Sequence, residues 1–278
     1  MSAVDPKALY DDVLTEHEVL ATRLRASSAD SWDLPTPAPG WSIRDQISHL
    51  AYFDDAARMA VSDPGAFVEL RQRALADIEG FVDAVRHDRR SDDPVQLLEW
   101  WRDGRRLMVE AFRAAEPSRR VPWFGPDMTV ASQATARLME TWAHGQDVAD
   151  ALGLPPVVSA RLRHVAHLGV RAFANSFRSH GLAVPDTAVR VELAAPDGGV
   201  WTWGPPDAID RVSGPALDFC MMVTQRRHLA DTALHAAGDV ARRWVSIAQA
   251  FAGPPGPGRE PGQFAAPAAA RPSEPGTP

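Results

Sequence analysis

Residues 138–153 read LMETWAHGQDVADALG, and this stretch decides where one long helix runs and which of its faces carries chemistry. The stretch is apolar nearly all round, and Gly153 ends the helix that we expect over 128–152. Glu140 and His144 are four residues apart, so they share one face of that helix, one turn above each other. A carboxylate and an imidazole on a buried helix need a partner, because burying unpaired ionisable groups is costly.

A second stretch, residues 41–51, reads WSIRDQISHLA and predicts another helix. Ser42 can cap its first turn, and Asp45 stands three residues later, where a carboxylate favours the positive end of the helix. His49 then lies about two turns inside. If the two helices pack side by side, His49 joins the pair at 140 and 144.

Two imidazoles and one carboxylate suit a divalent cation such as zinc, and nickel and iron(II) are alternatives. Three protein ligands leave a position for water or substrate, which is typical of catalytic sites. The other interpretation of Glu140 and His144 is a hydrogen-bonded pair within one helix, on a polar face. A metal site at His49, Glu140 and His144 is the interpretation that accounts for both stretches.

Composition excludes several classes of protein. The 278 residues carry a formal net charge of -7, which argues against binding to nucleic acid, because such proteins display basic patches. The only cysteine, Cys220, excludes an intrachain disulfide and a CxxC metal site, and fits a reducing compartment. No signal peptide and no run of about 18 apolar residues is present, so we expect a cytoplasmic protein without a membrane span.

The pattern along the chain predicts an α+β protein. Helical spacing of apolar residues extends to about residue 180, and 188–203 alternates apolar and polar residues around a Pro-Asp-Gly-Gly turn, as in a β-hairpin. We expect a helical bundle over 1–155, a small α+β domain over 156–252 and a disordered Pro/Gly/Ala-rich tail over 253–278. The predicted helices lie at 5–28, from 42 on, 67–87, from about 94 past 112, 128–152, 159–180, from 214 on and 239–251, with a short strand at 210–213.

Together the two stretches resemble the metal-binding four-helix bundle of the DinB-like superfamily, near the actinobacterial mycothiol-dependent maleylpyruvate isomerase group. The resemblance implies an N-terminal up-and-down four-helix bundle in which His49, Glu140 and His144 hold the metal, followed by a smaller α+β domain. Residues 191–231 resemble a small domain that some members share with wyosine-base-formation proteins, which describes a shared segment and implies no activity.

The resemblance also implies a function. The implied function is a metal-dependent enzyme that acts on a small organic acid or electrophile. Such an enzyme would resemble a maleylpyruvate isomerase or a thiol transferase and would use mycothiol as co-substrate. In the isomerases an arginine of the C-terminal domain reaches the metal cleft, which makes Arg226 or Arg227 the catalytic candidate here. From the residues alone, a charge run such as 226–228 is more often a solvated face.

Two other functions remain open. One is a metal-dependent hydrolase, lyase or cyclase of secondary metabolism that uses no thiol. The other is a non-catalytic metal-binding bundle that binds a small ligand or a partner, for example as a homodimer through its helix faces.

Several other residues are weaker candidates for a functional role. Asp147 is placed to accept the second N–H of His144, or else it solvates its helix. Arg105 and Arg106 are typical of a surface. His164 and His167 are three residues apart, with no third ligand nearby in the sequence, and Cys220 is expected to be a core thiol.

Overall fold

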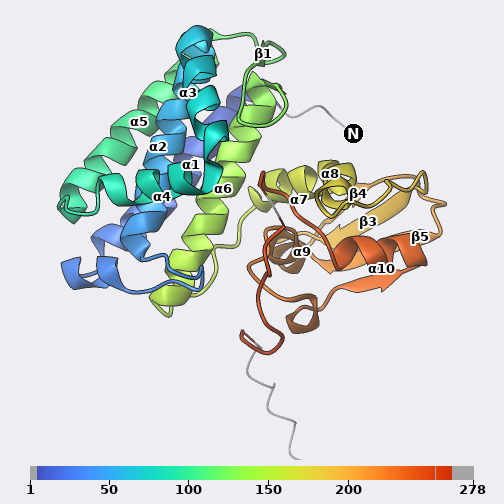
Figure 1. Ribbon diagram of the computed structural model, residues 1–278. Helices are drawn as coiled ribbons and strands as arrows, with labels where there is room; N and C mark the ends of the chain where they lie inside the picture. The colour runs from blue at the N-terminus through green and yellow to red at the C-terminus, as the bar shows by residue number, and fades with distance from the viewer. Residues whose placement is uncertain (1–4, 254, 265–278) are drawn as a thin grey trace, which may run out of the picture. The chain divides into compact units, whose positions relative to one another are not determined.

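The computed structural model describes residues 5–253 and 255–264, apart from the side chains of residues 78 and 79. Over these residues the chain is mostly helical up to residue 179, apart from one pair of two-residue strands, and contains a four-stranded sheet after it (Figure 1). The elements are α1 (Pro6–Arg25), η1 (Ala29–Asp33), α2 (Ile43–Ser62), α3 (Pro64–Ala76), α4 (Ile78–Asp88), α5 (Pro94–Ala114), β1 (Arg120–Val121), β2 (Met128–Thr129), α6 (Val130–Ala151), α7 (Leu162–Arg171), α8 (Phe173–Ser179), β3 (Val189–Ala194), β4 (Val200–Trp203), β5 (Asp210–Pro215), α9 (Ala216–Val223), η2 (Leu229–Asp231), β6 (His235–Ala237) and α10 (Asp239–Val245).

Four long helices form the N-terminal bundle. α2 packs against α5 and α6, and α1 packs against the same two helices, so each helix has two neighbours in a closed ring. The apolar side chains at the centre are almost completely buried and come from all four helices, among them Leu24, Ile47, Trp101 and Val148. The predicted helical bundle, followed in the sequence by a smaller sheet-containing domain, is therefore confirmed.

The start of α2 follows from its first turn. Ser42 accepts a hydrogen bond from the backbone N–H of Asp45, and the Asp45 carboxylate accepts from the backbone N–H of Ser42, which is a capping box. Ile43, Ile47 and Leu50 then fall on the face that points into the bundle. This capping fixes the register of α2 and thereby the direction in which His49 points.

Two predicted helices are each divided in the structure. The helix expected over 67–87 is interrupted at Asp77, whose backbone φ of -154° is not helical and whose side chain accepts from the N–H of Gly80. Asp77 ends α3 and caps α4, because a short carboxylate competes well for free amides at a helix start. The helix expected over 159–180 is likewise two helices, α7 and α8.

The C-terminal unit contains a four-stranded sheet in the order β4-β3-β5-β6. β3 pairs antiparallel with β4, with Val191 opposite Trp203, which confirms the predicted hairpin. β3 pairs parallel with β5, and β5 pairs antiparallel with β6, a short strand that the sequence pattern did not predict. Helices α9 and α10 pack against this sheet, where Val191 and Val212 are fully buried.

The chain divides into two compact units between Leu168 and Gly169, inside α7, whereas the sequence pattern places a boundary after residue 155. From residue 265 on, the tail that we predicted to be disordered lies outside the described residues. Its described part contacts the rest of the C-terminal unit, since the N–H of Gly262 donates to Asp231 at 2.8 Å.

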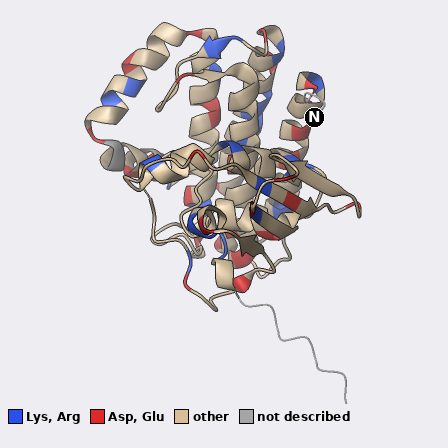
Figure 2. Cartoon of the chain, turned by 90° about the vertical axis from the view of Figure 1, so that its right-hand side faces the viewer, with Lys and Arg blue, Asp and Glu red and all other residues tan. Residues whose placement is uncertain are grey.

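Charged residues are interspersed along the chain, and Figure 2 shows both basic and acidic positions on the helices. The described helices include none that is both long and apolar enough to cross a membrane.

Candidate metal centre

Glu140 and His144 lie on one face of α6, as their spacing requires. The N-terminus of α6 is capped by the Thr129 hydroxyl, which accepts from the N–H of Ser132 at 3.1 Å. Three turns further on, Oε2 of Glu140 lies 3.1 Å from Nε2 of His144. The helix is buried on most of its circumference here, so the pair points into the bundle.

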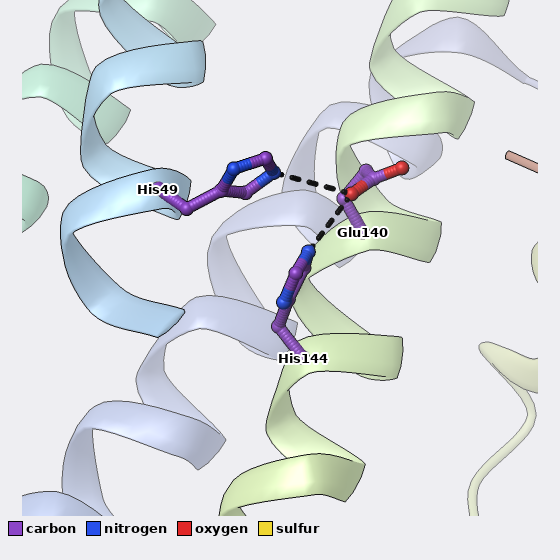
Figure 3. A group of neighbouring side chains, drawn as sticks. All are labelled: His49, Glu140 and His144. Atoms are coloured by element: carbon purple, nitrogen blue, oxygen red, sulfur yellow. Dashed lines mark hydrogen bonds and ion pairs between the residues drawn. The ribbon is translucent and has the colours of Figure 1, made fainter. Parts of the chain in front are cut away.

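His49 approaches the same carboxylate from α2. Its Nε2 lies 3.8 Å from Oε2 of Glu140, and Figure 3 shows both imidazoles directed at that oxygen. One ligand atom from each of the three residues lies within 4.8 Å of the others. The side chains are only 11–21% exposed, so the group is largely enclosed but not sealed from solvent.

The protonation states suit a cation. Burial penalises the imidazolium of His49 and lowers its pKa from 6.5 to about 4, in spite of the nearby carboxylate. Burial by itself would raise the pKa of Glu140, but hydrogen bonds from His144 and His49 and the charge of Arg137 bring it well below its ordinary value. At neutral pH Glu140 is therefore an anion beside a neutral His49, as a metal ligand set requires.

A chain of hydrogen bonds holds His144 from behind. Nδ1 of His144 is hydrogen-bonded to Oε1 of Gln46, one turn before His49 on α2. The Gln46 amide donates from Nε2 to the hydroxyl of Thr36 at 2.9 Å, and that hydroxyl donates to the carbonyl of Trp41 at 2.8 Å. Sequence reasoning offered Asp147 for this role and missed Gln46. The sequence signal that could have identified Gln46 is its position on α2, about one turn before His49.

A buried ionic cluster lies beside the site. Asp54 of α2 accepts from Nε of Arg105 at 2.6 Å, from Nε of Arg137 at 2.9 Å and from the indole of Trp101 at 3.0 Å. Arg137 also donates to the carbonyl of Leu50 at 3.3 Å, so it ties α6 to α2 at the residue after His49. Arg105 is 1% exposed, so its assignment to the surface is wrong. It is buried because the Asp54 carboxylate inside the bundle forms an ion pair with it.

Aromatic rings flank the histidines. The ring centroid of Trp41 lies 5.3 Å from that of His49 and 5.9 Å from that of His144, and Phe53 lies 4.5 Å from His49 on the other side. Phe53 in turn contacts Phe124, whose centroid is 5.4 Å away, in the loop between β1 and β2. The surroundings of the site are thus apolar, which strengthens electrostatic interactions within it.

The two arginines predicted to be catalytic lie in the C-terminal unit, directly after α9. Arg226 donates from Nη1 to the carbonyl of Thr224 at 2.7 Å, and the guanidinium of Arg227 lies 4.1 Å from the ring centroid of Phe264. Their approach to the triad remains a prediction.

The donor set fits a divalent cation by its chemistry. Nε2 of His49 and Nε2 of His144 lie 3.8 and 3.1 Å from Oε2 of Glu140, which is close to the roughly 3.3 Å between two donors that are each about 2 Å from one tetrahedral zinc ion. The carboxylate is ionised and His49 is neutral without any rearrangement. A 2-His-1-carboxylate set serves zinc, nickel and iron(II) alike.

Comparisons with known proteins divide the chain in the same way. Residues 13–149 match the family described as "Mycothiol maleylpyruvate isomerase N-terminal domain", and residues 185–237 match "Wyosine base formation". Uncharacterized proteins of Mycobacterium tuberculosis, from strains CDC 1551 and H37Rv, are each 48% identical over 255 residues, which cover 92% of this chain and 99% of theirs.

Solved structures agree on the fold. The crystal structure of the mycothiol-dependent maleylpyruvate isomerase superposes with a TM-score of 0.52 at 14% identity, over 81% of this chain and 90% of that one. A histidine-to-alanine mutant of that isomerase gives a TM-score of 0.51 at 15% identity, with the same coverage. At this identity the likeness extends to the fold.

Proposed function

Because the chain belongs to the family defined by the mycothiol maleylpyruvate isomerase N-terminal domain, we propose that it is a metal-dependent enzyme acting on a small organic acid or electrophile. His49, Glu140 and His144 would hold one divalent cation, with zinc as the first candidate and nickel or iron(II) as alternatives. The observation that carries this proposal is the convergence of two imidazoles and one ionised carboxylate within 4.8 Å, on two helices of the bundle.

When bound, such a cation would supply a Lewis acid and lower the pKa of a coordinated water or thiol toward neutrality. The protein residues would hold and orient the ligands of the cation. Glu140 neutralises one positive charge and keeps both imidazoles directed inward, and Gln46 orients His144. Trp41 and Phe53 limit the access of water to the histidines.

In the isomerase-like reaction that we propose, mycothiol is the co-substrate. Its thiolate adds to an activated carbon–carbon double bond, and the negative charge moves to the conjugated carbonyl oxygen as an enolate. Rotation about the new single bond follows, and elimination expels the thiolate and restores the double bond in the other geometry. Arg226 or Arg227 would balance the enolate charge with a guanidinium, which is well suited to planar oxygen pairs.

The first experiment measures metal content. We would purify the protein without chelator or histidine tag and determine zinc, nickel and iron for the parent, His144→Ala and Glu140→Gln. His164→Ala is the matched control, because His164 also pairs with a carboxylate, that of Asp12 at 2.9 Å, but belongs to no group of three potential metal ligands among the described residues. We expect one metal per chain in the parent and in His164→Ala, and little in the other two.

The second experiment tests the reaction. Isomerisation of a cis-unsaturated oxo-diacid would be followed by absorbance with and without mycothiol. Turnover that requires the thiol supports the proposal, and turnover of an ester, amide or lactone without thiol would favour a metal-dependent hydrolase. A parent that folds but takes up none of the three metals refutes the proposal.

A further inference from the structure

We propose that Gln46 is the positioning residue of the metal centre: it selects which nitrogen His144 presents to the cation and connects that ligand to the loop before α2. This inference rests on the proposed metal site and adds a residue that none of the comparisons assigns. Gln46 is fully buried, so its amide must find its partners within the protein.

The direction of each hydrogen bond follows from one fixed acceptor. The carbonyl of Trp41 can only accept, so the Thr36 hydroxyl gives its single proton to it. Thr36 must then accept from the next group, which places the NH₂ of Gln46 against Thr36 and its carbonyl oxygen against His144. The carbonyl oxygen needs a donor, so Nδ1 of His144 carries a proton.

This assignment sets the chemistry of the other nitrogen. A cation that binds His144 needs the lone pair of Nε2, and Nε2 is the atom that is directed at the carboxylate oxygen of Glu140, 3.1 Å away. With Nδ1 engaged by Gln46, the chain of hydrogen bonds leaves Nε2 as the nitrogen that a cation can bind, in place of its hydrogen bond to Glu140. Metal-binding histidines generally need such a partner for the second nitrogen.

The two histidines differ in this respect. Nδ1 of His49 is buried and has no hydrogen-bond partner among the described residues. His144 is thus the anchored ligand, and His49 is the one that can adjust when a cation binds. Gln46 and His49 both lie on α2. This helix therefore supplies one metal ligand, His49, and also the residue that holds His144, the ligand on α6.

The same chain reaches the loop that carries Trp41. Both the N–H and the hydroxyl of Thr36 bond to the carbonyl of Trp41, so residues 36–41 are closed into a turn by the group that holds Gln46. The indole of Trp41 lies against both imidazoles. A change at Thr36 should therefore reach the metal centre without touching a ligand.

The test compares metal affinity across four variants. Gln46→Leu removes the acceptor, Gln46→Glu keeps an acceptor oxygen, and Thr36→Val removes the next connection. Gln133→Leu is the matched control, because Gln133 is also fully buried in the bundle, on α6, but neither of its amide atoms has a hydrogen-bond partner in the described structure. Zinc affinity would be measured against a chromophoric chelator, and the Co²⁺-loaded forms would be compared by visible absorption.

Loss of an outer partner typically weakens metal binding by about 10–100-fold. We expect that loss for Gln46→Leu together with a changed Co²⁺ spectrum, a smaller loss for Thr36→Val, and near-parent affinity for Gln46→Glu and Gln133→Leu. Equal losses in Gln46→Leu and Gln133→Leu, or none in Gln46→Leu, would overturn the positioning role. If Gln46→Leu does not fold, Gln46→Glu and Thr36→Val decide, and a Thr36→Val affinity equal to that of the parent counts against it. A parent that binds no metal would instead refute the metal site itself.

Discussion

Replacing Asp54 should cost far more stability than replacing its neighbour Asp55. Asp54 and its two arginine partners are 0–3% exposed, so Asp54→Ala would leave two buried guanidinium groups without the carboxylate that they share. Removing one partner of a buried pair costs about 3–5 kcal/mol. Asp55 lies 3.8 Å from Arg58 in a partly exposed pair, and such pairs contribute about 0–1 kcal/mol.

The measurement is urea unfolding of the metal-free proteins at pH 7, followed by circular dichroism. Asp55→Ala is the matched control, since Asp55 also accepts an indole hydrogen bond, from Trp100 at 2.9 Å. We expect Asp54→Ala to lose about 3 kcal/mol more than Asp55→Ala, at a similar dependence on denaturant. Equal losses in the two variants would show that the buried cluster does not hold the helices together as argued.

A stricter version exchanges the whole cluster. The triple variant Asp54→Leu, Arg105→Met, Arg137→Met removes all three charges together. Replacing a buried ion cluster by apolar side chains is often neutral for the stability of the fold or increases it. The triple variant should therefore be more stable than Asp54→Ala alone. If it is less stable, the cost of Asp54→Ala comes from lost packing and not from unpaired charge.

Three further predictions concern single residues. Burial, together with the charge of Arg105, lowers the pKa of His17 from 6.5 to about 3, so only the unfolded chain takes up this proton and stability falls as the pH drops through 6.5. Between pH 6.5 and 5 we expect a loss of about 1.6 kcal/mol that His17→Phe removes, as urea titrations at both pH values would show. Gly238→Ala should lower the melting temperature more than Gly153→Ala, because both have positive φ but only at Gly238 would a Cβ lie 2.3 Å from an Asp210 carboxylate oxygen; equal shifts would contradict this. Cys220 is 0% exposed and should react with a thiol reagent only at the rate of unfolding, so rapid modification of the native protein would be inconsistent with the structure.

Much of the bundle follows from local signals. Ser42 and Asp45 predict the start of α2, and the four-residue spacing of Glu140 and His144 predicts their shared face on α6. The meeting of His49 with that face depends on how α2 and α6 pack, and the resemblance to a known bundle supplied this step. Local periodicity alone does not contain it.

The misses have physical causes. The break at Asp77 depends on one side chain capping Gly80, and the apolar period continues across it. β6, His235–Ala237, is too short to show alternation and exists because β5 offers it an edge. Gln46 carries no charge and matches no motif, so only the three-dimensional hydrogen-bond chain identifies it.

The ring of helices in the bundle also has a consequence for synthesis. α1 packs on α6, and the last residue of α6, Ala151, follows the end of α1, Arg25, by 126 positions (151 - 25). At about 5–20 residues per second, roughly 6–25 s pass before that partner has been translated. During this time the part of the apolar face of α1 that packs on α6, which the finished protein buries, has to stay in solution or be covered by a chaperone.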